Sequence, residues 1–387
     1  MTMKQSTSAA PLAVGLTAVA AVAAYFWAFL SVESNVAVLG LLALAALAAI
    51  FSRKIAPSLD RAMDEHDCVM HGAILAALLV LIALFAEDHF PLLMFSTTLL
   101  YMTAALGLNI QFGYAGIVNF AGAAFFGIGS YTSAVLTAQG LVPPILILVL
   151  GGIIAAAIGF VLILPVLRTR GHYSAVVTIA FSVLFVSFLQ VNDVLGGPQG
   201  LSVGAMSLLG WDFGTGPTLF GVETSFYVNY ALASVALAAL AFTFTRRLER
   251  SWLGLSLDAV RLDETASACC GIGIRRAKVL AFGFGNLLIG LAGALFGMMI
   301  GYIAPTSFTF SDSLLMVAIV LLGGMGSLWG TALAAAIVVL LPEKLQVLQE
   351  YRFLLFSVMV IAMLLFRPQG LLPRGVRRFV PGWRPAE

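Results

Sequence analysis

Long apolar stretches recur along this chain from one end to the other, and they constrain its fold more than any other feature. They cover residues 12–30, 36–51, 72–86, 91–108, 113–136, 145–167, 173–191, 226–245, 279–303, 313–341 and 352–366. A helix that spans a bilayer needs about 20 apolar residues, whereas a spanning strand needs about 10 residues of alternating polarity. The stretches are mostly too long and too uniformly apolar for strands. They therefore predict an all-α, polytopic bundle of transmembrane helices.

The composition agrees with a chain that folds inside a bilayer. Hydrophobic residues make up 61% of the sequence and charged residues 10%, whereas soluble domains average about 45–50% and about 25%. The formal net charge of +2 gives no electrostatic reason to expect a nucleic-acid partner. The first apolar stretch is longer than the hydrophobic region of a signal peptide, so we interpret the first two stretches as retained helices.

The distribution of Lys and Arg predicts the orientation of the chain in a bacterial inner membrane. Basic residues gather in the loop 246–278, in the tail after residue 366 and in the patches 53–54 and 168–170, while residues 192–225 contain none. Loops rich in Lys and Arg stay on the cytoplasmic side. We therefore expect the four basic segments and both chain termini in the cytoplasm, and residues 192–225 outside.

Glycines interrupt two of the apolar stretches. The stretch 313–341 contains Leu322-Gly323-Gly324-Met325-Gly326-Ser327, and the second glycine-rich segment is 113–129. Glycine permits backbone conformations that end a helix, and the loop 246–278 and the tail must be separated by an even number of crossings. We therefore read 313–341 as two short helices, which gives about 10–12 crossings in all. Transporters place such broken helices along their substrate path; tight helix packing is the alternative.

The sequence provides few groups for chemistry. None of the lysines (Lys4, Lys54, Lys278 and Lys344) follows a glycine, which excludes an ATP-binding P-loop. No Asp, Glu or Lys lies inside the apolar stretches, which disfavours a proton-coupled carrier, although sodium coupling through backbone carbonyls stays open. Asp64-Glu65-His66-Asp67-Cys68 lacks a known metal-ligand spacing, and no catalytic set is recognisable. We expect no enzyme activity, no cofactor and no metal.

The loop 246–278 is where we expect a partner protein to supply work. Asp263 can cap a short helix over residues 264–270, and Gly271 can end it. Glu264 suits the N-terminal end of the helix dipole. Small residues such as Ala266 let the helix enter a groove on a partner. An amphipathic loop that lies on the lipid headgroups is the alternative interpretation.

Four polar side chains gather near the first glycine-rich segment: Asn109, Gln111, Tyr114 and Asn119. Buried amides cost free energy unless they are partnered. We predict that these residues, together with Gly323 and Gly324 of the second segment, line or brace a substrate path. Hydrogen bonds between helices are the alternative.

Several stretches, taken in order, resemble one family. They are Gly107-Leu108-Asn109-Ile110-Gln111-Phe112-Gly113-Tyr114-Ala115-Gly116, Asn119-Phe120, Arg170-Gly171-His172-Tyr173, Gly196-Gly197-Pro198-Gln199-Gly200-Leu201, Asp263-Glu264 with Gly271, Lys278-Val279-Leu280-Ala281-Phe282, Leu322-Gly323-Gly324-Met325-Gly326-Ser327-Leu328-Trp329-Gly330 and Phe366-Arg367-Pro368-Gln369-Gly370-Leu371. Over residues 92–372 this set resembles the LivM-type permease subunit of branched-chain amino acid ABC importers. The resemblance implies a permease core at 91–372 with a cytoplasmic coupling loop at 246–278, a three-helix N-terminal transmembrane extension at 1–90 and a basic cytoplasmic tail at 373–387.

The resemblance also implies partners. These are a LivH-type permease subunit, two cytoplasmic ATP-binding subunits and a periplasmic substrate-binding protein. Glu264, Ala266 and Gly271 match the family's version of the EAA coupling loop, which docks on the ATPase. Gly122 and Ser182-Val183 stand where family members often carry more polar residues, so the path is expected to be less polar. Branched-chain or other hydrophobic amino acids are the implied solutes. A urea or short-amide importer is the main alternative, and an ion-coupled carrier is less favoured.

Overall fold

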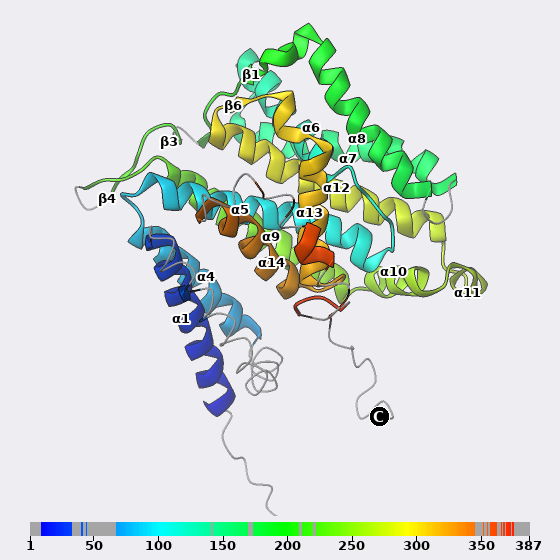
Figure 1. Cartoon of the computed structure of the whole chain (residues 1–387), viewed down its shortest axis with the longest axis horizontal. Coiled ribbons are helices and arrows are strands. Elements are labelled where there is room, and N and C mark those ends of the chain that lie inside the picture. The colour runs from blue at the N-terminus through cyan, green and yellow to red at the C-terminus, as the bar shows by residue number, and fades with distance from the viewer. Residues whose placement is uncertain are drawn as a thin grey trace, which may run out of the picture. The chain divides into compact units, whose positions relative to one another are not determined.

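The computed structural model describes residues 9–32, 40–41, 44, 67–140, 142–168, 173–208, 211–219 and 222–344, with scattered positions between 351 and 374. The apolar stretches 36–51 and 352–366 lie mostly outside the described residues. Lys4, the patch 53–54, Asp64, Glu65, His66 and residues 169–172 also lie outside them. In the described part of the chain almost every element is a helix and each strand is two residues long (Figure 1), which confirms the all-α prediction.

The chain forms two compact units. The first contains residues 1–96, 213–239 and 340–350. In it, α1 (Ala9–Ser31) packs against α4 (Asp67–Leu84), and β4 (Thr218–Leu219) pairs with β5 (Val222–Glu223). Lys344, at the end of α14 (Leu328–Lys344), donates hydrogen bonds of 2.6 and 3.1 Å to the carbonyl oxygens of Leu30 and Val32. A cation at the carboxyl end of α1 satisfies carbonyls that a helix leaves unpaired. The predicted boundary at residue 90 stays a prediction.

The second unit contains residues 97–212, 240–339 and 351–387. Its centre is formed by three mutually packed helices, α6 (Gly122–Gln139), α7 (Pro144–Arg168) and α12 (Ile274–Ile300), and α8 (Tyr173–Val191) packs beside them (Figure 1). Glycine makes the close approach possible, because a Cβ at Gly129 would lie 2.0 Å from the carbonyl oxygen of Gly290. A Cβ at Gly293 would likewise lie 2.0 Å from the carbonyl oxygen of Phe126.

The two ends of α12 mark two sides of the second unit. α12 has 27 residues and is therefore about 40 Å long. Its N-terminal end follows α10 (Trp252–Leu262) and α11 (Glu264–Cys269), which continue from α9 (Tyr227–Glu249). Its C-terminal end leads into β6 (Tyr302–Ile303), which pairs with β1 (Leu201–Ser202). The basic loop and the segment after α8 thus lie at opposite ends of α12, as the predicted orientation requires.

Short elements follow α8. They are the 3-10 turns η2 (Asp193–Leu195) and η3 (Gly197–Gln199), then β2 (Ser207–Leu208), which pairs with β3 (Trp211–Asp212). Asn192 starts this segment: its Oδ1 accepts hydrogen bonds from the amides of Val194 and Leu195 at 3.0 and 3.3 Å. The local turns therefore arise from side-chain capping rather than from an extended sheet.

Seven described helical segments are long and apolar enough to cross a membrane. They are Ala13–Ser31, His89–Tyr114, Pro144–Arg168, Tyr173–Val191, Tyr227–Glu249, Ile274–Ile300 and Pro305–Gly323. Val69–Leu84 is a shorter apolar helix. The chain is thus a multi-pass membrane protein. The expected 10–12 crossings include stretches outside the described residues, and that number stays a prediction.

Both predicted helix breaks are present, and the first lies within the predicted glycine-rich segment 113–129. α13 (Phe310–Gly323), preceded by the 3-10 turn η4 (Pro305–Phe308), ends where Gly324 and Gly326 adopt φ values of +107° and +83°, and α14 begins at Leu328. α5 (His89–Asn109) does not stop before Gly113, because a π-helical turn, η1 (Ile110–Tyr114), extends it. Residues 115–121 are non-helical. That segment is as apolar as the helices beside it, so hydropathy could not locate its boundaries.

Candidate functional site

The two helix breaks meet around Asn109. Its Oδ1 accepts a hydrogen bond of 2.8 Å from the amide of Gly326, and its Nδ2 donates to the carbonyl oxygen of Ser327 at 3.2 Å and to Thr331 Oγ1 at 3.1 Å. The Tyr114 hydroxyl donates to the carbonyl oxygen of Gly326 at 3.1 Å. We call Asn109, Tyr114, Gly326, Ser327 and Thr331 the break junction. Backbone groups freed by a break inside a membrane need such partners.

Glycine allows the two broken helices to touch directly. A Cβ at Gly113 would lie 2.3 Å from the amide nitrogen of Gly326. No side chain fits between these backbones, so η1 and the second break are in direct contact. The two glycine-rich segments, which lie in different halves of the sequence, therefore form one structural feature.

A second set of amides links η1 to α12. Asn119 Nδ2 donates to Gln111 Oε1 at 2.7 Å, and Gln111 Nε2 donates to Asn286 Oδ1 at 2.9 Å and to the carbonyl oxygen of Phe282 at 3.2 Å. Asn119 Oδ1 accepts from the amide of Ala121 at 2.9 Å. All three side chains are fully buried. We call Asn119, Gln111 and Asn286 the amide chain. Asn286, an isolated amide within an apolar stretch, was not among the predicted site residues.

The structure thus brings the four predicted polar residues into two neighbouring networks. Asn109 and Tyr114 belong to the break junction, whereas Gln111 and Asn119 belong to the amide chain. Each is buried and bonded to atoms of the protein. This is the geometry of hydrogen bonds between segments, the alternative considered for them from the sequence. Their part in a substrate path stays a prediction.

Gly323 and Gly324 allow close backbone contacts. A Cβ at Gly323 would lie 2.5 Å from the carbonyl carbon of Gly330, and one at Gly324 would lie 2.7 Å from the carbonyl oxygen of Gln369. The amides of Leu371 and Leu372 donate to the carbonyl oxygens of Leu322 and Gly323 at 2.8 and 3.3 Å. The C-terminal segment therefore caps the end of α13. That the two glycines also border a path stays a prediction.

The short helix of the basic loop forms as predicted. Asp263 Oδ1 accepts from the amides of Thr265 and Ala266 at 2.8 and 3.0 Å, which starts α11. Gly271 has φ = +79°, and its amide donates to the carbonyl oxygen of Ala268 at 3.0 Å, which ends the helix. Of the six residues of α11, only Ser267 is buried. Figure 1 shows α10 and α11 following one another at the edge of the second unit.

The charge of Glu264 is already paired within the chain. Lys278 Nζ donates to Glu264 Oε1 at 2.6 Å, and the Glu264 side chain keeps 56% of its exposure. An exposed ion pair of this kind contributes about 0–1 kcal/mol, so it leaves the carboxylate able to exchange partners. α10 is held differently, because its Leu257 and Val260 side chains are each only 2% exposed.

Arg374 makes a partly buried ion cluster that the sequence did not reveal. Its Nη1 and Nη2 donate to the two carboxylate oxygens of Asp258 at 2.6 and 2.8 Å, and its Nε donates to Glu249 Oε1 at 3.3 Å. The guanidinium lies 4.6 Å from the centre of the Tyr114 ring. Burial, the largest single influence, lowers the pKa of Arg374, but the hydrogen bonds and charge of Asp258, with Tyr114 and Glu249, raise it above its usual value. In the sequence, this residue contributed only to the basic character of the tail.

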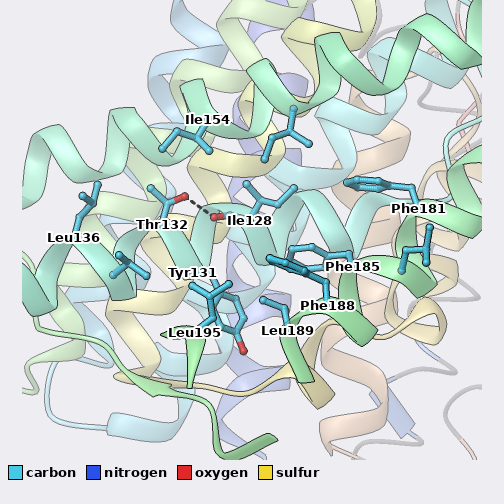
Figure 2. A pocket seen from close by; sticks show the side chains of 13 residues that line it. Ile128, Tyr131, Thr132, Leu136, Ile154, Phe181, Phe185, Phe188, Leu189 and Leu195 are labelled. Carbon is cyan, nitrogen blue, oxygen red and sulfur yellow. Dashed lines mark hydrogen bonds between the residues drawn. The ribbon is translucent and has the colours of Figure 1, made fainter. Parts of the chain in front are cut away.

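An apolar groove of about 510 Å³ lies on α6, α7 and α8 (Figure 2). Its lining consists of Ile128, Tyr131, Thr132, Val135, Leu136, Ile154, Ile158, Phe181, Leu184, Phe185, Phe188, Leu189 and Leu195. The Thr132 hydroxyl donates to the carbonyl oxygen of Ile128 at 2.7 Å within its own helix (Figure 2). The groove therefore offers apolar contact and almost no polar partner. Among the described residues, no group of three or more His, Cys, Asp or Glu side chains could hold a metal ion.

Comparisons with known proteins agree on one family. Residues 90–366 match the family described as "Branched-chain amino acid transport system / permease component". The chain is 35% identical over 290 residues to the high-affinity branched-chain amino acid transport system permease protein LivM of Escherichia coli, covering 71% of this chain and 68% of that protein. It is 27% identical over 326 residues to the probable LivM permease of Methanocaldococcus jannaschii, covering 71% and 90%. It is also 26% identical over 289 residues to the LivH permease of Salmonella typhimurium, covering 71% and 91%. No solved structure gives a significant match.

Proposed function

Because the chain belongs to the family of permease components of branched-chain amino acid transport systems, we propose that it forms one half of a solute path across the bacterial inner membrane. A LivH-type permease supplies the other half. Two cytoplasmic ATP-binding subunits drive the transport, and a periplasmic binding protein delivers the solute. Both termini of the chain lie in the cytoplasm in this arrangement.

The observation that carries the proposal is the exposed, capped helix α11 at one end of α12. The chain has no P-loop, so ATP hydrolysis must reach it through contact with another protein. α11 is short, is made of small residues and is exposed along most of its length. We infer that Ala266 enters a groove on the ATPase, that Glu264 exchanges Lys278 for a basic group of the partner, and that Gly271 turns the chain back towards α12.

The substrate path is proposed to run beside the break junction and the amide chain. Asn109, Gln111, Tyr114 and Asn119 brace its wall, and Gly323 and Gly324 let the second break close against it. The buried hydrogen bonds support this arrangement, because broken helices are tolerated in a membrane only where protein or a wet cavity satisfies them. Branched-chain or other hydrophobic amino acids are the proposed solutes, since the named relatives are branched-chain amino acid permeases.

Reconstitution tests the proposal. The chain is purified together with its partner permease and ATPase subunits, placed in proteoliposomes and supplied with ATP and the binding protein. We expect uptake of radiolabelled leucine, isoleucine or valine that needs both ATP and the binding protein. Uptake of urea in place of the amino acids would move the assignment to a short-amide importer. Uptake driven by a sodium gradient without ATP would contradict it.

A further inference from the structure

The C-terminal segment ties together parts of the second unit that are far apart in the sequence. Leu371 and Leu372 bond the carbonyl end of α13, and Gly370, with φ = +85°, packs against Gly324. Two residues further on, Arg374 donates hydrogen bonds to Asp258 of α10 and to Glu249 at the end of α9. We call Gly370, Leu371, Leu372 and Arg374 the C-terminal tie.

The tie reaches the break junction through two contacts of Arg374. Its guanidinium lies over the ring of Tyr114, whose hydroxyl donates to the carbonyl oxygen of Gly326. A Cβ at Gly326 would lie 3.0 Å from Arg374 Cδ, so the side chain also lies directly against this glycine. One side chain therefore contacts both α10, which precedes the coupling helix, and the point where the two broken helices meet.

We propose that Arg374 is a positioning residue that transmits displacement of α10 and α11 to the break junction. The inference rests on the proposed importer function and names the internal link that this function requires. The planar guanidinium binds both oxygens of Asp258 at once, which fixes its orientation as well as its position. When a partner moves α10, Asp258 carries Arg374 with it, and Arg374 in turn displaces Tyr114 and Gly326.

Partial burial and bidentate bonding hold Arg374 against Asp258. The Arg374 and Asp258 side chains are 16% and 23% exposed, so little water competes for their hydrogen bonds. Energetic coupling between sites is carried by contiguous packed and hydrogen-bonded groups. The path from Asp258 through Arg374 and Tyr114 to Gly326 is contiguous in this sense. A lysine at position 374 would keep the charge but lose the bidentate geometry and the planar group over the Tyr114 ring.

The test uses the complete importer in proteoliposomes and measures two rates, ATP hydrolysis stimulated by the loaded binding protein and leucine uptake. The variants are Arg374→Gln, Arg374→Lys, Asp258→Asn and the double variant Arg374→Gln/Asp258→Asn. Arg367→Gln is the matched control, because it removes the same charge from an exposed side chain of the same C-terminal segment. Recovery of assembled complex is measured for each variant.

We expect Arg374→Gln to keep ATP hydrolysis while leucine uptake per ATP falls. The fall should be roughly 5- to 150-fold, the size of effect that coupling between two linked sites typically has. Asp258→Asn should reproduce this loss, the double variant should be no worse than either single variant, and Arg374→Lys should be intermediate. The control should match the wild type.

Unchanged uptake per ATP in Arg374→Gln would overturn the inference. So would a parallel loss of hydrolysis, uptake and assembled complex, since that would make the tie purely structural. If the wild-type complex shows no ATP-dependent uptake, the importer function fails and the inference falls with it, whereas normal wild-type transport with a fully coupled Arg374→Gln variant removes the inference alone.

Discussion

Asn109 and Gly326 come from different halves of the chain and are joined by a hydrogen bond of 2.8 Å from the Gly326 amide to the Asn109 carboxamide oxygen. The same side chain donates to Ser327 and Thr331 on the other side of the break. One buried amide thus satisfies three polar groups around a helix break. Inside a membrane no water is available to bond these three groups if the Asn109 amide is removed.

Replacing Asn109 by alanine should therefore destabilise the break junction and impair transport. Leaving a buried donor or acceptor without a partner costs about 1–3 kcal/mol. We expect the purified Asn109→Ala variant to have a lower thermal unfolding midpoint in detergent and reduced uptake after reconstitution, while the complex still assembles. Asn119→Ala should act in the same way through the amide chain.

Thr132→Val is the control for both alanine variants, because the Thr132 hydroxyl bonds only the carbonyl of Ile128 in its own helix in the described structure. It should change neither quantity appreciably. Wild-type uptake in both Asn109→Ala and Asn119→Ala would show that neither residue braces the path.

Glycine packing in the second unit gives a stability prediction. A Cβ at Gly129 would meet the backbone of α12 at 2.0 Å, and backbone cannot move aside as a flexible side chain can. Overpacking of this kind costs about 1–3 kcal/mol, so Gly129→Ala should lower the thermal unfolding midpoint. Gly72→Ala is the matched control in α4, since nothing lies within 4 Å of its Cβ position, and it should be neutral or stabilise by about 0.5–1 kcal/mol. Equal midpoints for the two variants would contradict the packing described here.

The turn after α11 should depend on how readily residue 271 adopts a left-handed backbone, and not on the size of its side chain. Gly271 has φ = +79° and open space around its Cβ position, so Gly271→Val pays only for the left-handed backbone, about 1–2 kcal/mol. Gly271→Asn should be milder, because asparagine visits this conformation more readily. We expect Gly271→Val to reduce solute-stimulated ATP hydrolysis in the assembled complex more than Gly271→Asn does.

Ala266 tests the docking role of α11 directly. Its side chain is exposed, so Ala266→Trp should insert and fold normally but block close contact with the ATPase. Co-purification of the ATPase subunits and stimulated hydrolysis should both fall. A matched change at the neighbouring exposed position, Thr265→Ser, should have no effect. Normal hydrolysis and transport in Ala266→Trp would mean that α11 is not the coupling element.

Orientation can be measured by thiol labelling in intact cells. Ser267 is buried and is unsuitable as a probe, but the native Cys269 and Cys270 are exposed on the same loop. In a Cys68→Ser background, a membrane-impermeant maleimide should label these cysteines only after the cells are permeabilised. Ser202→Cys, at the exposed position of β1, should be labelled without permeabilisation when Cys269 and Cys270 are replaced by serine. The reverse pattern would invert the proposed topology.

The sequence alone determined the features that depend on local chemistry. Apolar stretches of membrane-spanning length predicted the helical bundle, because a chain in lipid must satisfy its own backbone. Asp263 and Gly271 predicted the limits of α11, since capping and a left-handed turn depend on neighbouring residues only. The glycines at 323–326 predicted where α13 ends for the same reason.

Only the tertiary structure decided which distant groups meet. The glycines of 113–129 predicted a break in this segment, but hydropathy could not give its bounds, because residues 115–121 are apolar although they are not helical. Asn109 and Gly326 are brought together by the packing of η1 against the second break, and Arg374 is brought to Asp258 by the hydrogen bonds of Leu371 and Leu372 to α13. Nothing in the local pattern around Arg374 distinguishes it from the other arginines of the tail. Its partners are set by long-range packing, which no short stretch of sequence encodes.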